Sequence, residues 1–186
     1  MNDICLLALG GNLPSRVGTP NKTIAAALKR LNCADISLCA VSRFYSTPCF
    51  PSGAGPDYVN AVASVQTSLT PAELLSRLHT VEADFGRNRQ QRWGMRTLDL
   101  DLISFNSLVL PDVETQTYWQ GLSLQAQLEV APEKLVLPHP RMQDRAFVLG
   151  PICDIAPDWT HPVSGECARD LLVGLPVEDQ NALIPL

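Results

Sequence analysis

Two aspartates separated by one residue are the first candidates for chemistry in this sequence. Asp99 and Asp101 alternate with Leu98, Leu100 and Leu102, and a period of two is typical of a strand with one buried face. Both carboxylates then point to the same side, with their Cα atoms ~7 Å apart. Because aspartate is a poor strand former and like charges repel, the pair favours a bound cation. Hard carboxylate oxygens suit Mg²⁺.

An arginine-rich segment comes directly before this strand. Between its flanking glycines and the first aspartate it contains Arg87, Arg89, Arg92 and Arg96. Guanidinium groups bind phosphate oxygens, and a polyanion held beside a metal predicts metal-assisted transfer of a phosphate-type group. The aspartate pair alone would also fit a solvated strand face, and the arginines alone would fit a charged turn. Because the two lie next to each other, we favour a functional site.

Composition limits what else the chain can be. With 186 residues, 46% hydrophobic and 18% charged, it predicts one folded domain. The net charge of −5 argues against broad nucleic-acid binding. No apolar run reaches the length of a membrane span, and the N-terminus lacks the basic segment of a signal peptide. Six cysteines without a Cys-x-x-Cys spacing predict reduced thiols in a cytoplasmic protein.

The order of the expected elements predicts the fold class. Short apolar runs bounded by turn residues predict strands, and Thr-Pro followed by apolar residues at helical spacing predicts helices. The expected order is strand, helix, strand, strand, helix, strand, over residues 4–9, 19–31, 36–45, 58–67, 70–85 and 98–105. This is an α+β, ferredoxin-like βαββαβ sandwich with a mostly antiparallel sheet. Both helices are expected on one face, which leaves the other face for ligands.

The rest of the chain gives weaker signals. Asn106-Ser107 predicts a turn into an extra β-hairpin strand over 108–110. Segment 111–134 lacks periodicity and is expected to be an insertion with a short helix near 122–128. C-terminal helices are expected to begin at Arg145, with Pro151 stopping the first of them. Residues 1–175 form the predicted domain, and 176–186 are expected to be a loosely attached tail.

A second group of polar residues follows the insertion. His139 lies between two prolines, and Arg141, Arg145 and Phe147 come shortly after it. A histidine in such a place is often only a surface loop residue. Two nearby arginines make the segment a candidate for binding an anion.

Five segments carry a resemblance to a known family. They are LALGGNL at 7–13, FYSTP at 44–48, PDYVNA at 56–61, GR…RWGMRTLDLDLI at 86–103, and LPHPRMQDRAFVLGPICDIAP at 137–157. Together they resemble the 6-hydroxymethyl-7,8-dihydropterin pyrophosphokinases of folate biosynthesis, over roughly residues 4–110 and 135–175. The resemblance implies transfer of diphosphate from ATP to the hydroxymethyl group of the pterin, with release of AMP and help from two Mg²⁺ ions.

The resemblance also implies roles for individual residues. Catalytic roles pass to Arg87, Arg96, Asp99 and Asp101, with both aspartates as metal ligands. ATP contacts pass to Glu82, Arg89, Arg92, Leu102, His139 and Arg145. Pterin contacts pass to Thr47, Pro48, Phe50, Tyr58, Asn60, Trp93 and Phe147. In this interpretation Tyr58 and Phe147 enclose the ring, and residues 86–94 form a lid that is mobile without ligand; from the residues alone, both aromatics would be assigned to the core.

Two other functions remain open at this point. Asp-x-Asp also occurs in glycosyl- and nucleotidyltransferases, although these need a larger nucleotide-binding domain than this chain readily supplies. Ferredoxin-like sheets also bind RNA through exposed aromatic residues, but here aromatics are only 6% and the charge is negative. The expected partners are therefore ATP and the pterin, without nucleic acid or membrane, and the chain is expected to be a monomer.

Overall fold

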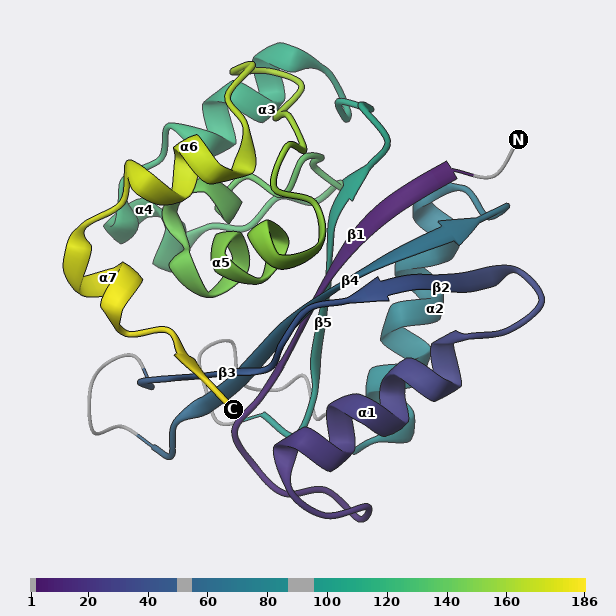
Figure 1. Cartoon of the computed structure of the whole chain (residues 1–186). Helices are drawn as coiled ribbons and strands as arrows, with labels where there is room; N and C mark the ends of the chain where they lie inside the picture. The colour runs from purple at the N-terminus through teal and green to yellow at the C-terminus, as the bar shows by residue number, and fades with distance from the viewer. Residues whose placement is uncertain (1–2, 50–54, 87–95) are drawn as a thin grey trace.

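A six-stranded antiparallel sheet forms the centre of the computed structural model, which describes residues 3–49, 55–86 and 96–186 (Figure 1). Its order is β5-β1-β4-β3-β6, and β2 pairs with the other half of the same β4 edge. The predicted α+β class and the βαββαβ order are confirmed. The strands are β1 (Asp3–Gly11), β2 (Ile36–Val41), β3 (Tyr45–Thr47), β4 (Tyr58–Thr67), β5 (Asp99–Phe105) and β6 (Ile184–Pro185).

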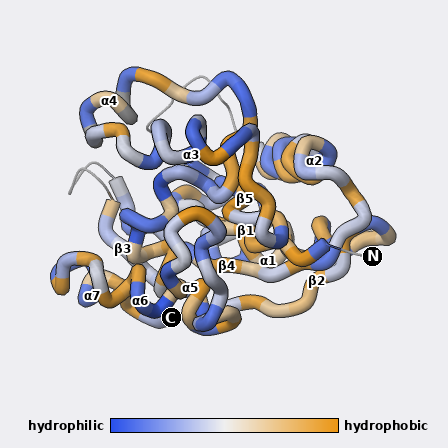
Figure 2. The backbone as a smooth tube through the Cα atoms, turned by 90° about the horizontal axis from the view of Figure 1, so that it is seen from above, coloured by the Kyte–Doolittle hydropathy of each residue, from blue (hydrophilic) through white to orange (hydrophobic). Residues whose placement is uncertain are grey.

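Two amphipathic helices cover one face of the sheet, as predicted (Figure 1). They are α1 (Pro20–Leu31) and α2 (Pro71–Asp84), each with proline in its first turn. Thr70 and Glu73 form the predicted capping box. Hydrophobic and hydrophilic residues alternate along α2 (Figure 2), and its buried side packs on a core that includes Leu9, Leu98 and Leu100.

The opposite face is not left open, contrary to the expectation. Helix α5 (Ala146–Ile155) packs across β4 and builds a second core. In it Leu149 and Ile152 meet sheet residues Leu6, Val62 and Ile103. Pro151 lies inside α5 instead of ending it, because burial of this apolar helix outweighs one lost hydrogen bond. In the described part of the chain, α5 therefore covers the middle of this face.

The last eleven residues are anchored, and the expectation of a loose tail is wrong. After α6 (Ala168–Val173) and α7 (Val177–Asn181), strand β6 pairs with β3. The Leu186 amide donates to the Phe44 carbonyl at 2.9 Å. Leu183 lies so close to Gly150 of α5 that a Cβ there would come within 2.5 Å of it. The C-terminus therefore ends beside β3 (Figure 1).

Three further segments differ from the sequence-based boundaries. The strand expected over 36–45 is interrupted after Val41, where Ser42 bonds to both main-chain groups of Val62. The expected 108–110 strand is reduced to a single bridge between Leu110 and Leu137. The insertion holds two helices, the expected one as α4 (Leu124–Glu129) and an unpredicted α3 (Val113–Gln120).

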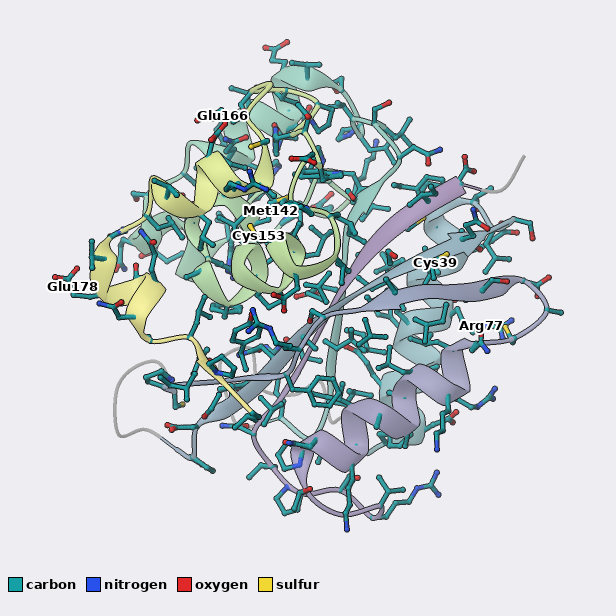
Figure 3. The ribbon with its side chains drawn as sticks, viewed as in Figure 1. Cys39, Arg77, Met142, Cys153, Glu166 and Glu178 are labelled. Carbon is teal, nitrogen blue, oxygen red and sulfur yellow. The ribbon has the colours of Figure 1, made fainter. Side chains whose placement is uncertain are left out.

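All six cysteines are free thiols. Cys153 lies in the α5 layer beside Met142, whereas Cys39 lies in β2, away from that layer (Figure 3). None of the helices in the described part of the chain is long and apolar enough to cross a membrane.

Candidate active site

Three adjacent strands bring the candidate residues to one end of the sheet. Asp99 on β5 pairs with Gly10 on β1, and Gly10 pairs with Asn60 on β4. In the next row Asp101 pairs with Ala8, which pairs with Val62. Because Ala8 and Val62 belong to the α5-side core, the aspartates and Asn60 face the same side. Neighbouring strands lie ~4.8 Å apart, so the Asp99 and Asn60 backbones lie about 10 Å apart across the glycine.

The two aspartates are fixed from behind by the alternating leucines. Leu98 and Leu100 are buried in the core beneath α1 and α2, while Asp99 and Asp101 are half-buried. Asp99 Oδ2 accepts a hydrogen bond from Arg96 Nη1 at 2.5 Å. Leu102 continues the apolar face and is only 3% exposed, so any contact between Leu102 and ATP must come from its main chain.

Glu82 holds the strand between the aspartates. β5 is an edge strand, and its Leu100 amide points away from β1, where no strand follows. Glu82 is fully buried on α2, and its Oε1 accepts from the Leu100 amide at 2.8 Å. The Glu82 carboxylate thereby provides the hydrogen-bond acceptor that the Leu100 amide needs at the sheet edge. Sequence reasoning had placed Glu82 among the ATP contacts.

His139 lies next to β5 as a neutral imidazole. Its amide donates to the Ile103 carbonyl at 2.8 Å, and its Nδ1 accepts from the Arg141 amide at 3.2 Å. The ring proton therefore sits on Nε2. The pKa of His139 is lowered to about 3, chiefly by removal of the ring from water and then by the positive charges of Arg145 and Arg141, while the Asp99 carboxylate acts in the opposite direction.

Arg145 joins the histidine segment to the aspartates. Burial lowers its pKa, and the Asp101 and Asp99 carboxylates act in the opposite direction. It is the N-cap residue of α5, and its Cζ lies 5.5 Å from the ring centre of Phe147 in the first turn. The structure thus brings a cation from each of two distant segments, Arg96 and Arg145, to one pair of carboxylates.

Three of the expected pterin residues, Thr47, Tyr58 and Asn60, lie on β3 and β4, on the other side of Gly10 from the aspartates. Asn60 Nδ2 donates to Thr47 Oγ1 at 2.8 Å, and both residues are buried. Tyr58 is half-buried; burial raises its pKa, which the Arg96 guanidinium opposes. Phe147 is 38% exposed, and Pro48 is exposed. The enclosure of a ring by Tyr58 and Phe147 stays a prediction.

Several predicted contacts fall outside the described residues. These are the lid over 86–94, apart from Gly86, and the side chains of Phe50, Arg87, Arg89, Arg92 and Trp93. In the other direction, sequence reasoning missed Asn12, which is 3% exposed and bonded to two other segments. The available signal was an asparagine directly after two glycines at the end of a buried strand.

The carboxylate pair suits a metal that arrives with its substrate. Among the described residues, no group of three or more His, Cys, Asp or Glu side chains is placed to hold a metal ion. Mg²⁺ is commonly bound through one or two carboxylates, with phosphate oxygens and water completing its octahedron. Asp99 and Asp101 on one strand face fit that donor set.

Comparison with known proteins agrees with this site. Residues 6–157 match the family model of 7,8-dihydro-6-hydroxymethylpterin-pyrophosphokinase (HPPK). The chain is 38% identical to the 2-amino-4-hydroxy-6-hydroxymethyldihydropteridine pyrophosphokinase of Pseudomonas aeruginosa, covering 92% of this chain and 91% of that protein. It is 37% identical to the Synechocystis protein of the same name, covering 90% of this chain and 73% of that one.

The fold also matches a solved structure with a second domain. The HPPK-DHPS of Plasmodium falciparum superimposes with a TM-score of 0.66 at 14% sequence identity, covering 93% of this chain. This chain spans 41% of that longer protein, so the likeness concerns one part of it. From the family match and the two bacterial relatives, the chain belongs to the HPPK family and transfers pyrophosphate from ATP to hydroxymethyldihydropterin in folate synthesis.

Proposed function

We propose that this transfer takes place over Gly10, between the aspartates of β5 and Asn60 of β4. The observation that carries the proposal is the row Asp99–Gly10–Asn60 across three strands. In this proposal Asp99 belongs to the phosphate-binding side and Asn60 to the pterin-binding side, on one face and about 10 Å apart at the backbone. Glycine between them leaves no side chain in the way of the reacting groups.

The reaction makes one bond and breaks one. The hydroxymethyl oxygen of the pterin attacks the β-phosphorus of ATP, and the bond from that phosphorus to the α,β-bridging oxygen breaks. AMP leaves with the bridging oxygen, and the hydroxyl proton is released. We propose two Mg²⁺ ions at Asp99 and Asp101; when bound, they neutralise charge that develops on the phosphate oxygens.

The protein side chains position the triphosphate and keep it there. Arg96 and Arg145 supply cations beside the carboxylates and can bind phosphate oxygens directly. Arg96 contacts Asp99 in this structure, so a bound triphosphate gives its guanidinium a competing partner. Neutral His139 can donate from Nε2 without adding a charge.

Replacing the aspartates tests the proposal. Asp99→Asn and Asp101→Asn keep the shape but remove the charge that holds the metal, so AMP release with both substrates should fall by at least ~10²-fold. The melting temperature should change little, because the attraction lost to Arg96 or Arg145 is offset by relief of the repulsion between the two carboxylates. Asp158→Asn is the matched control, since that carboxylate is almost fully exposed and its neighbour Trp159 lies near Ser104, at the end of β5 away from Asp99; it should keep wild-type turnover.

Two outcomes would count against the site. Near-wild-type turnover of both aspartate variants at saturating Mg²⁺ would make the pair a solvated strand face. AMP release that does not depend on hydroxymethyldihydropterin would mean that the acceptor is different. We further propose that the chain acts as a cytoplasmic monomer, which sedimentation at assay concentration tests for its oligomeric state.

A further inference from the structure

Asn12 connects two segments that enter the site from opposite sides. Its Oδ1 accepts from the Arg96 amide at 2.8 Å, and its Nδ2 donates to the Pro56 carbonyl at 3.1 Å. An amide donor and a carbonyl acceptor at these places admit one orientation of the side-chain amide. The Asn12 and Leu13 amides both donate to the Arg96 carbonyl, at 2.9 and 3.1 Å. One buried side chain thus joins both segments to the end of β1.

Each segment leads directly into one half of the proposed site. From Pro56 the chain enters β4 at Tyr58 and reaches Asn60. From Arg96 it enters β5 at Asp99. Gly11 allows this close approach, because a Cβ there would lie 2.6 Å from the Thr97 carbonyl oxygen. Within the sheet the two halves are not neighbours, because β1 separates β4 from β5.

We propose that Asn12 is a positioning residue that sets both substrate sites at once, through separate atoms. Its carbonyl oxygen fixes the Arg96–Asp99 side, where the triphosphate binds. Its amide nitrogen fixes the Pro56–Asn60 side, where the pterin binds. The inference rests on the proposed location of the two sites, and it assigns one atom of Asn12 to each.

The two atoms can be separated by substitution. Asn12→Asp keeps an acceptor for the Arg96 amide but loses the donor to Pro56, where a carboxylate would instead face a carbonyl oxygen. Asn12→Ala loses both bonds and leaves two main-chain groups without their partner. Asn32→Ala is the matched control: Asn32 Oδ1 also accepts a main-chain amide, from Leu38 at 3.0 Å, at the start of β2 outside the site.

The experiment measures binding instead of turnover. Dissociation constants are obtained by calorimetry for hydroxymethyldihydropterin and for Mg²⁺ with α,β-methylene-ATP, each on wild type and on all three variants. For Asn12→Asp we expect pterin affinity to fall roughly tenfold or more while nucleotide affinity changes less than about threefold. For Asn12→Ala both affinities should fall, and for Asn32→Ala neither should.

The inference and the proposed function fail in different ways. If the wild type binds neither compound, the proposed sites are wrong. If the wild type binds both and Asn12→Asp lowers only the melting temperature, Asn12 is merely a structural turn residue and the inference is overturned. Loss of nucleotide affinity alone in Asn12→Asp would overturn the assignment of the two atoms.

Discussion

Gly10 matters at the residue scale because of the side chain that it lacks. A Cβ on Gly10 would lie 2.9 Å from Asn60 Oδ1, closer than side-chain carbons approach an oxygen without displacement. Asn60 can therefore lie over β1 and still donate to Thr47. The residue that leaves room for the reacting groups also sets the position of the amide expected to recognise the pterin.

Asn60→Ala should separate the two substrates. The change removes the amide that donates to Thr47 and that is expected to bind the pterin edge. A polar ligand edge left without a partner costs roughly 1–3 kcal/mol, so pterin affinity should fall about 10–100-fold while ATP affinity stays nearly the same. Calorimetric titration with each compound alone measures both values.

Ser64→Ala provides the comparison for Asn60→Ala. Ser64 lies on the same strand but lines a pocket of about 380 Å³ at the other end of the sheet, beside Trp159. Its loss should leave both affinities unchanged. A fall in ATP affinity for Asn60→Ala, with pterin affinity retained, would place the pterin elsewhere.

Single residues show what the sequence could and could not predict about the site. Asp99 and Asp101 were predictable, because alternation along one strand depends only on local geometry. Arg145, which interacts electrostatically with both aspartates, lies more than 40 positions later in the chain. No rule of sequence spacing relates the two segments. Asn12 was missed for the same reason, since both of its partners are distant in sequence.

At the scale of elements, the C-terminus supports the helix and the strand that carry residues expected to bind the pterin. Strand β6 extends the sheet beside β3, which ends at Thr47. Leu183 packs against Gly150 of α5, the helix whose first turn holds Phe147. The sequence suggested a loose tail because two-residue strands and five-residue helices have no detectable period.

Leu183→Ala should therefore weaken both stability and pterin binding. The change removes part of a half-buried apolar side chain, so the free energy of unfolding should fall by about 1–2 kcal/mol. The Michaelis constant for the pterin should rise more than that for ATP, because β3 and α5 lose a shared support. Urea unfolding and initial-rate kinetics measure the two effects.

Leu186→Ala is the control for the C-terminal segment. Leu186 is 62% exposed and contributes its main-chain amide to Phe44, a bond that alanine keeps. Its variant should behave as wild type. Equal increases in the Michaelis constants of both substrates for Leu183→Ala would show general loosening and would contradict a local role.

At the scale of the whole molecule, sequence reasoning predicted C-terminal helices but did not foresee that they cover the second face of the sheet. The order of the first six elements was readable because each has its own period and end signals, such as the capping box at Thr70. Helix α5 covers the second face because Leu6, Val62 and Ile103 pack against it. These contacts join segments that are far apart in the sequence, so no local pattern predicts them. As a consequence, the proposed site combines aspartates from β5 with His139, which bonds to β5, and with Arg145, the N-cap residue of α5.

The half-buried histidine beside the aspartates makes the stability of the whole fold depend on pH. The pKa of His139 is lowered to about 3 by burial in the folded protein, whereas an unfolded histidine titrates near 6.5. Between these values the unfolded chain binds more protons than the folded one, so the free energy of unfolding falls as the pH falls from about 6.5 toward 3. From pH 7 to pH 5 the loss from this group should be roughly 1–2 kcal/mol.

His139→Asn tests this dependence, because asparagine cannot take up a proton as the pH falls. His161 is also buried and its pKa is shifted in the same direction, so both proteins should still lose stability in acid, and the difference between them isolates His139. Urea unfolding at pH 7 and pH 5 should show a loss smaller by roughly 1–2 kcal/mol in the variant than in the wild type. An equal loss in the two proteins would mean that the folded imidazole takes up its proton as readily as the unfolded one, and that His139 is not held neutral beside Arg145.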